Sequence, residues 1–100
     1  MSNAKTDAAV IEIRGQLDEA HRLLQMAEEA AELAQAASKL ARILMGINPS
    51  PMPEDSARAH LLEEYNDVRV CAMTLDLPER VMPGKLYRWA ERLRNRKWRS

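Results

Sequence analysis

The fold is decided by one uninterrupted stretch, residues 16–45, which reads QLDEAHRLLQMAEEAAELAQAASKLARILM. It contains neither proline nor glycine, the two residues that most often interrupt a helix. Its apolar side chains recur at spacings of mostly three and four, as they do along one face of an α-helix. These residues are Leu17, Ala20, Leu24, Ala27, Ala31, Ala34, Leu40, Ala41 and Leu44. The stretch therefore predicts one long amphipathic helix.

A shorter helix and a loop are predicted on either side of this stretch. Residues 7–14 have a helical pattern with Asp7 as the N-cap, and Gly15 is expected to separate them from the long helix. Gly46 suits the C-terminal cap of the long helix, because glycine adopts the left-handed conformation found there. Three prolines within residues 49–53 then require a loop.

Two further helices are predicted downstream of the proline loop. The first begins after Ser56, a good N-cap, and runs to about Leu75. Pro78 and Pro83 bracket the next connection, and a basic C-terminal helix follows over residues 84–97. All the predicted elements are helices, so the expected fold class is all-α, a helical bundle.

The length and composition indicate one small domain with a thin core. The chain has 100 residues, of which 46% are hydrophobic and 30% charged, an ordinary mixture for a globular protein. Phenylalanine is absent and aromatic residues make up only 4%, so the core must be aliphatic. We therefore expect oligomerisation, as a homodimer or homotetramer, to complete the core. Residues 1–4 are interpreted as an expression-tag remnant, and the predicted domain covers residues 5–100.

Several function classes are excluded by what the sequence lacks. Three isolated glycines form no phosphate-binding loop, and the single cysteine permits neither an internal disulfide nor a cysteine-cluster zinc site. No apolar run approaches the roughly 20 residues of a membrane span, and no signal peptide is visible. We expect a cytoplasmic protein without a membrane partner.

The informative acidic run of the long helix is Glu28-Glu29-Ala30-Ala31-Glu32. Glu28 and Glu29 lie four and three residues before Glu32, spacings at which like charges share a helix face and repel. No lysine or arginine lies one turn away to offset the repulsion. Such a run also occurs on ordinary solvated helix faces, and that alternative stands for a single cluster.

A second cluster of the same kind lies in the following helix, where Glu63 and Glu64 precede Asp67 by four and three residues. Only His60 stands nearby as a cation, and apolar residues flank the carboxylates, which suggests that they lean toward a helix interface. Two unpaired carboxylate clusters on two helices indicate a shared cation. Hard oxygen ligands suit Mg²⁺, or Mn²⁺ as a substitute, and Mg²⁺ points toward phosphate chemistry.

The spacing Glu28-Glu29-x-x-Glu32 followed by Glu64-x-x-Asp67 resembles the EExxE…ExxD signature of the MazG-like, all-α nucleoside triphosphate pyrophosphohydrolases. The resemblance covers residues 25–70, and residues 85–89 are similar, more weakly, to a basic C-terminal helix of some members. It implies a helical bundle that hydrolyses nucleoside triphosphates between the α and β phosphorus atoms, releasing the monophosphate and pyrophosphate. A role in clearing unwanted nucleotides follows from the same resemblance.

The resemblance also implies roles for individual carboxylates. Glu29, Glu32, Glu64 and Asp67 would be the Mg²⁺ ligands. Glu28 would be a catalytic carboxylate that supports the ligands or orients the attacking water, a role in which Glu29 is also a candidate.

Charge is distributed unevenly along the chain, although its formal net charge is zero. Residues 84–100 hold seven basic side chains and one acidic side chain, which gives +6, and residues 1–83 hold eight and 14, which gives −6. Lys85, Arg88 and Arg92 share one helix face and are candidates for binding phosphate, or form a solubilising face that docks on the acidic body.

Three further groups have both functional and structural interpretations. Lys39, two turns after Glu32, either reaches a phosphate or is a surface lysine. Trp89, within the basic face, either stacks on the nucleotide base or belongs to the core. Cys71, His21 and His60 are interpreted as core or surface residues rather than ligands.

Two alternative functions compete with the enzyme interpretation. The basic C-terminal helix with its tryptophans is also typical of a nucleic-acid-binding module, although the acidic body makes nucleic acid a less favoured partner than a nucleoside triphosphate. A non-catalytic helical oligomer could instead use its acidic pairs for contacts between subunits.

Overall fold

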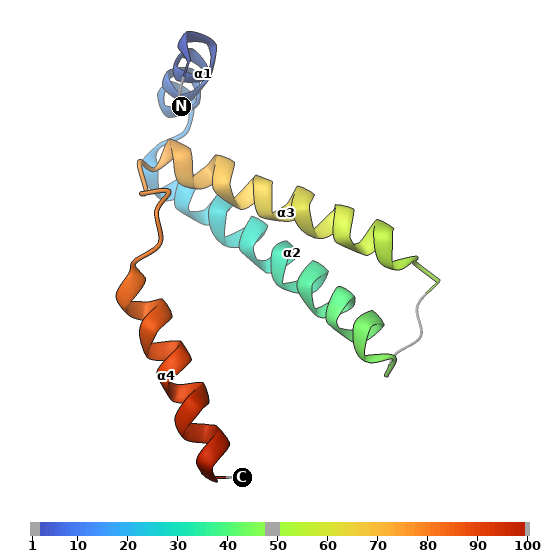
Figure 1. The fold of residues 1–100 in the computed structure, drawn as a ribbon. Coiled ribbons are helices and arrows are strands. Elements are labelled where there is room, and N and C mark those ends of the chain that lie inside the picture. Colours follow the sequence, from blue (N-terminus) through green and yellow to red (C-terminus); the bar gives the residue numbers. More distant parts are fainter. Residues whose placement is uncertain (1–2, 48–50, 100) are drawn as a thin grey trace.

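A computed structural model describes residues 3–47 and 51–99 of the chain. This part forms four helices and no strand, which confirms the all-α class (Figure 1). The helices are α1 (Ala4–Gln16), α2 (Glu19–Met45), α3 (Glu54–Thr74) and α4 (Pro83–Arg99). None of the described helices is long and apolar enough to cross a membrane.

The helices α2 and α3 form an antiparallel hairpin, the main packed unit of the chain (Figure 1). The helix α1 contacts α3 at the end of the hairpin where α3 finishes, and α4 leads away from the hairpin. The radius of gyration is 17.7 Å, against about 13 Å for a compact domain of this length. A single chain is therefore extended rather than a closed bundle.

The ends of α2 follow from local capping chemistry. The Asp18 side chain accepts a hydrogen bond from the backbone N–H of His21 at 2.8 Å, so α2 begins at Glu19 instead of residue 16. That backbone hydrogen bond is the main reason why the pKa of the exposed Asp18 carboxyl lies below its usual value. Gly46 ends the helix with φ at 68°, which confirms the predicted left-handed cap.

The start of α1 differs from the sequence prediction. Asn3 is the N-cap, with its Oδ1 accepting from the Thr6 N–H at 2.8 Å, and Asp7 lies inside the first turn. The prediction of an Asp7 cap is wrong because Asn3, among the best N-cap residues, was assigned to a tag remnant. Gly15 stays within α1, and the break follows at Leu17, whose backbone is extended.

The start of α3 also differs. Pro53 occupies the N-cap position and α3 begins at Glu54, so the predicted cap, Ser56, lies inside the helix. Glu54 and Asp55 occupy the first turn, where carboxylates favour the positive end of the helix dipole. The helix ends at Thr74, one residue before the predicted limit, and residues 48–50 of the predicted loop lie outside the described residues.

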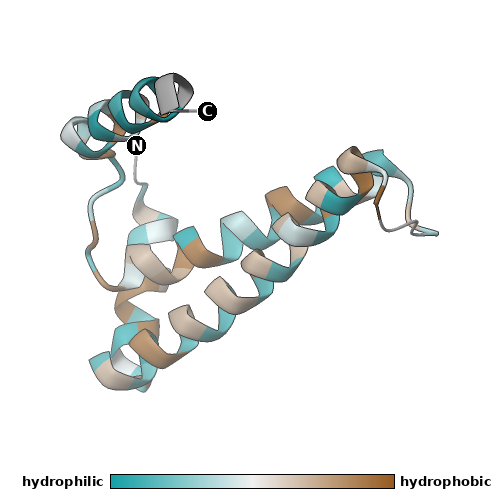
Figure 2. Cartoon of the chain, turned by 90° about the horizontal axis from the view of Figure 1, so that it is seen from below, coloured by the Kyte–Doolittle hydropathy of each residue, from teal (hydrophilic) through white to brown (hydrophobic). Residues whose placement is uncertain are grey.

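The core of the hairpin is small and uses little of the predicted apolar stripe of α2. Only Ala36, Leu40 and Ala57 are buried among the described apolar residues. Of the nine stripe residues, Leu40 is buried, Ala41 is half-buried and the others are exposed. Most of the stripe is therefore exposed, and only its C-terminal part, at Leu40 and Ala41, is buried or half-buried. Apolar residues extend along the hairpin, whereas hydrophilic residues dominate α4 (Figure 2).

Two arginines fasten α1 and the start of α2 to the end of α3. Arg14 Nε donates to the backbone carbonyl of Thr74 at 2.8 Å, and Arg22 Nη1 donates to the same oxygen. The Thr74 side chain is buried, and its hydroxyl donates to the Cys71 carbonyl at 2.8 Å. These contacts satisfy carbonyls that a helix end leaves without partners.

Candidate metal centre

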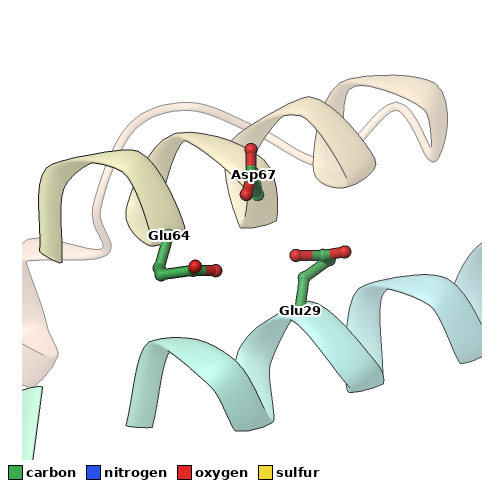
Figure 3. Close-up of side chains that lie close together, drawn as sticks. All are labelled: Glu29, Glu64 and Asp67. Atoms are coloured by element: carbon green, nitrogen blue, oxygen red, sulfur yellow. The ribbon is translucent and has the colours of Figure 1, made fainter. Parts of the chain in front are cut away.

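Three carboxylates meet in the middle of the α2–α3 hairpin. Glu29 extends from α2, and Glu64 and Asp67 extend from neighbouring turns of α3 (Figure 3). One oxygen from each carboxylate lies within 4.8 Å of the others, and all three residues are half-buried. The expectation that the second cluster leans toward the helix interface is confirmed for Glu64 and Asp67, whereas Glu63 is exposed.

The Glu64 side chain is largely enclosed, with 13% of its surface exposed. Its Oε1 lies 3.1 Å from His60 Nε2, whereas its Oε2 is buried and has no hydrogen-bond partner among the described residues. A buried charged oxygen without a partner is unfavourable, because its lost hydration is not replaced. A bound cation would supply the missing interaction.

The Glu29 side chain is hydrogen-bonded to a residue of its own helix. Its Oε1 accepts a hydrogen bond from Gln25 Nε2 at 3.0 Å, the residue one turn earlier. Within the described part of the chain, no lysine or arginine forms an ion pair with Glu29, Glu64 or Asp67. Three oxygen-only donors without a lysine or arginine partner match the ligands that Mg²⁺ and Mn²⁺ prefer.

The carboxylates of this site affect the pKa of the Cys71 thiol. Burial raises the pKa of its thiol, and the negative charges of Glu29 and Asp67 raise it further. The thiol therefore stays protonated at neutral pH and is not one of the grouped donors. This agrees with its interpretation as a structural residue.

Two predicted acidic residues lie outside the group of three. Glu28 and Glu32 are exposed on α2, on either side of Glu29 along the sequence. The hairpin thus brings together three of the four predicted ligands, whereas Glu32 is exposed on α2 and is not one of the grouped donors.

The predicted cationic and aromatic residues are not brought to the site within one chain. Lys39 is exposed and lies about 15 Å along α2 from Glu29, by the helical rise per residue. The α4 residues are exposed on a helix that does not pack on the hairpin (Figure 1). They are Lys85, Arg88, Trp89 and Arg92.

Two contacts to the site were missing from the predicted set of site residues. Gln25 contacts Glu29 and His60 contacts Glu64, in each case across one helical turn. The spacing of four residues is visible in the sequence and indicates such contacts. The packing of α2 against α3 decides which carboxylates turn inward, so spacing alone could not single out these two contacts.

Comparisons of the chain with protein-family models, with curated proteins and with solved structures find no match.

Proposed function

We propose that the protein is a Mg²⁺-dependent nucleoside triphosphate pyrophosphohydrolase of the MazG-like all-α type. It would cleave ribo- or deoxyribonucleoside triphosphates between the α and β phosphates and release pyrophosphate. The observation that carries the proposal is the group of Glu29, Glu64 and Asp67, whose oxygens lie within 4.8 Å of one another with Glu64 Oε2 unpartnered among the described residues.

The proposed metal ligands come from both helices of the hairpin. Glu29, Glu64 and Asp67 would hold the cation, with Mn²⁺ as a substitute for Mg²⁺, and Glu32 would add a fourth carboxylate from its exposed position on α2. When bound, the cation would neutralise phosphate charge and lower the pKa of a water molecule. Gln25 and His60 would orient the carboxylates that they contact.

Proton transfer, phosphate binding and base stacking are assigned to side chains of the protein itself. Glu28, an exposed carboxylate outside the grouped donors, is the proposed acceptor of the proton from the attacking water. Phosphate charge would be met by Lys39 and by the basic side chains of α4. Trp89, which is 58% exposed, offers a surface on which a nucleotide base can stack. Clearance of unwanted nucleotides is the role that this chemistry suits.

One observation favours a second candidate, a nucleic-acid-binding module. In the described part of α4, every basic side chain is exposed and none forms an ion pair. Binding through such a helix would weaken steeply with salt, because it releases counterions from the nucleic acid. It would not depend on Glu64 or on a divalent cation, which separates it from the enzyme.

A pair of adjacent substitutions tests the proposed enzyme. Glu64→Gln removes the half-buried carboxylate, and Glu63→Gln removes an exposed one beside it in the sequence. The first is expected to lower pyrophosphate release by at least about a hundredfold, about 2.7 kcal/mol in transition-state stabilisation, and the second by less than about threefold. Equal activity of the two variants would contradict the site assignment.

A further inference from the structure

We infer that a groove on the outer face of α3 binds one helix of a partner protein, a helix that presents an acidic residue, apolar residues and then a basic residue on one face. The groove has a volume of about 590 Å³ and runs from Tyr65 in α3 to Glu79 in the connection to α4. One residue turns a helix by about 100°, so Arg69 in this groove lies on the side of α3 opposite to Glu64 and Asp67. The inference concerns a separate surface and does not depend on the proposed enzyme activity.

The floor of this groove is apolar and open to solvent. Val70, Met73 and Leu77 line it, and each of them is between 40% and 47% exposed. Pro78 continues the apolar surface beyond the end of α3. Exposed apolar side chains gathered in one groove are typical of an interaction surface, because contact with a partner removes them from water.

Charged side chains of opposite sign lie at the two ends of the floor. Arg69 belongs to the α3 end of the groove, and Asp76 and Glu79 belong to the end in the connection. The guanidinium carbon of Arg69 lies 5.8 Å from the centroid of the Tyr65 ring, a cation–π contact that restricts the position of the guanidinium. None of the three charged side chains forms an ion pair with another described residue. Each of them is therefore available to a partner of opposite charge.

Asp76 occupies a position where a carboxylate lowers the stability of the fold. Its N–H donates to the Met73 carbonyl at 3.2 Å and the Leu77 N–H donates to the Ala72 carbonyl at 3.1 Å, the two bonds of a Schellman cap. Glycine is favoured at the left-handed residue of this cap, where Asp76 has φ at 58°. A negative charge next to the C-terminus of a helix is also unfavourable for the helix dipole. A carboxylate that costs stability in two ways and lines a groove indicates a role in binding.

The spacing of the charges fits a helix as the occupant. Arg69 and Asp76 are seven residues apart, about 10.5 Å by the rise of a helix. Two residues seven positions apart in a partner helix share a face and span the same distance, whereas same-face residues of an extended strand lie about 6.6 or 13.2 Å apart. Apolar residues three and four positions after the first charge then face the floor of the groove.

Charge complementarity determines the direction of the partner helix. An acidic residue opposite Arg69, followed by a basic residue opposite Asp76 and Glu79, places the partner helix parallel to α3. This order also stabilises the partner helix itself, since a negative charge near its N-terminus and a positive charge near its C-terminus favour the helix dipole. The occupant is therefore a helix whose contact face has the order acidic, apolar, basic.

NMR titration of the isotope-labelled full chain, in EDTA and without nucleotide, tests the inference with two synthetic peptides. The lysine probe is an alanine-based helix with a glutamate, leucines three and four residues later, and a lysine seven residues later. The glutamate probe has a second glutamate in place of the lysine. The lysine probe is expected to shift the backbone amide signals of Val70 and Leu77 and to bind at least about tenfold more tightly than the glutamate probe.

Three variants show which carboxylates act in binding. In Asp76→Asn/Glu79→Gln the ratio of the two affinities is expected to fall below about twofold, because the charges are lost while asparagine keeps the left-handed backbone. Asp76→Gly is expected to raise the Tm and to weaken the lysine probe, since glycine suits the cap and lacks the carboxylate. The matched control is Asp55→Asn, which removes an exposed carboxylate at the other end of α3 and should leave both affinities unchanged.

Several outcomes would overturn the inference. Equal affinities of the wild type for the two probes, or a preference that persists in Asp76→Asn/Glu79→Gln, would remove the charge pairing. Signal shifts confined to residues outside the groove would remove the site. Absence of binding would overturn it as well, and hydrogen exchange that slows at Val70 and Leu77 as the protein is concentrated would then assign the groove to a contact between copies of the chain.

Discussion

Glu64 directs one carboxylate oxygen at His60, with 3.1 Å between Oε1 and Nε2, and holds the other oxygen buried without a partner among the described residues. Both residues belong to α3, one turn apart, so the contact orients the carboxylate toward Glu29 on the facing helix. Burial of an unpartnered oxygen in an acidic environment costs stability. A divalent cation at the three carboxylates would reverse that cost.

Cation binding is expected to stabilise the fold, and Glu64→Gln is expected to abolish that effect. At a Mn²⁺ concentration of roughly ten times Kd, binding contributes about 1.4 kcal/mol, which raises the Tm of a domain of this size by about 5–10 °C. Without a cation, the variant is expected to melt no lower than the wild type, because the substitution removes like-charge repulsion. Thermal denaturation in EDTA and in MnCl₂ measures both effects. The Glu63→Gln variant should respond to Mn²⁺ like the wild type, and an equal response from Glu64→Gln would contradict the site.

Cys71 is expected to report the charge of the site through its alkylation rate. Burial, then Glu29 and Asp67, raise the pKa of its thiol, so Glu29→Gln should lower that pKa and increase the thiolate fraction. Iodoacetamide at pH 8 should therefore modify Glu29→Gln faster than the wild type, and Mg²⁺ should accelerate the wild type in the same direction. The chain has one cysteine, so mass spectrometry follows a single event. An unchanged rate in Glu29→Gln would show that the carboxylate does not act on the thiol.

The raised pKa of Cys71 also predicts that the free energy of unfolding falls at high pH. The neutral thiol is favoured in the folded state, so its contribution is fully present below the ordinary thiol pKa of 9.0 and is lost as pH rises through the folded-state value. The wild type should therefore lose more stability than Cys71→Ala between pH 8 and pH 10. Urea denaturation at both pH values measures the difference. An identical loss in both proteins would contradict the shift.

Arg14 is expected to contribute to stability by fastening α1 to the end of α3. Its guanidinium donates to the partly buried Thr74 carbonyl at 2.8 Å, and Arg14→Ala should cost about 1–2 kcal/mol. The matched control is Arg58→Ala, which removes an exposed ion pair with Glu54 and should cost less than about 0.5 kcal/mol. Urea denaturation measures both costs. Equal values would show that the α1 contact does not stabilise the hairpin.

Two glycines are expected to respond oppositely to replacement by alanine. Gly46 has φ at 68°, so Gly46→Ala forces a left-handed alanine and should destabilise the protein by about 1 kcal/mol. Gly15 lies inside α1 with nothing within 4 Å of an added Cβ, so Gly15→Ala should stabilise α1 by about 0.5–1 kcal/mol. Opposite shifts in Tm are the expected result, and shifts of the same sign would contradict the helix boundaries.

The helices were predictable from the sequence because their signals are local. Apolar periodicity, the absence of helix breakers and the cap at Gly46 placed the long helix within a few residues. The N-caps at Asp7 and Ser56 were wrong because several residues near each start can cap a helix, and Asn3 and Pro53 occupy those positions.

Which face of each helix turns inward was less predictable, because it depends on the pairing of two helices. The strongest apolar stripe of α2 includes Leu24, yet the residues that pack against α3 include Ala36. The lack of nearby lysine and arginine pointed to Glu29, Glu64 and Asp67, but periodicity could not show that Glu32 is exposed and lies outside their group. The placement of α4 was beyond local signals, because its described residues do not pack on the α2–α3 hairpin.

The most direct test of the proposed function is pyrophosphate release by the wild type over the eight common ribo- and deoxyribonucleoside triphosphates, in Mg²⁺ and in EDTA. We expect Mg²⁺-dependent formation of the monophosphate and pyrophosphate in equal amounts from at least one substrate, and none in EDTA. Release of the diphosphate and inorganic phosphate, or no turnover of any nucleotide by protein that Mn²⁺ demonstrably stabilises, would contradict it.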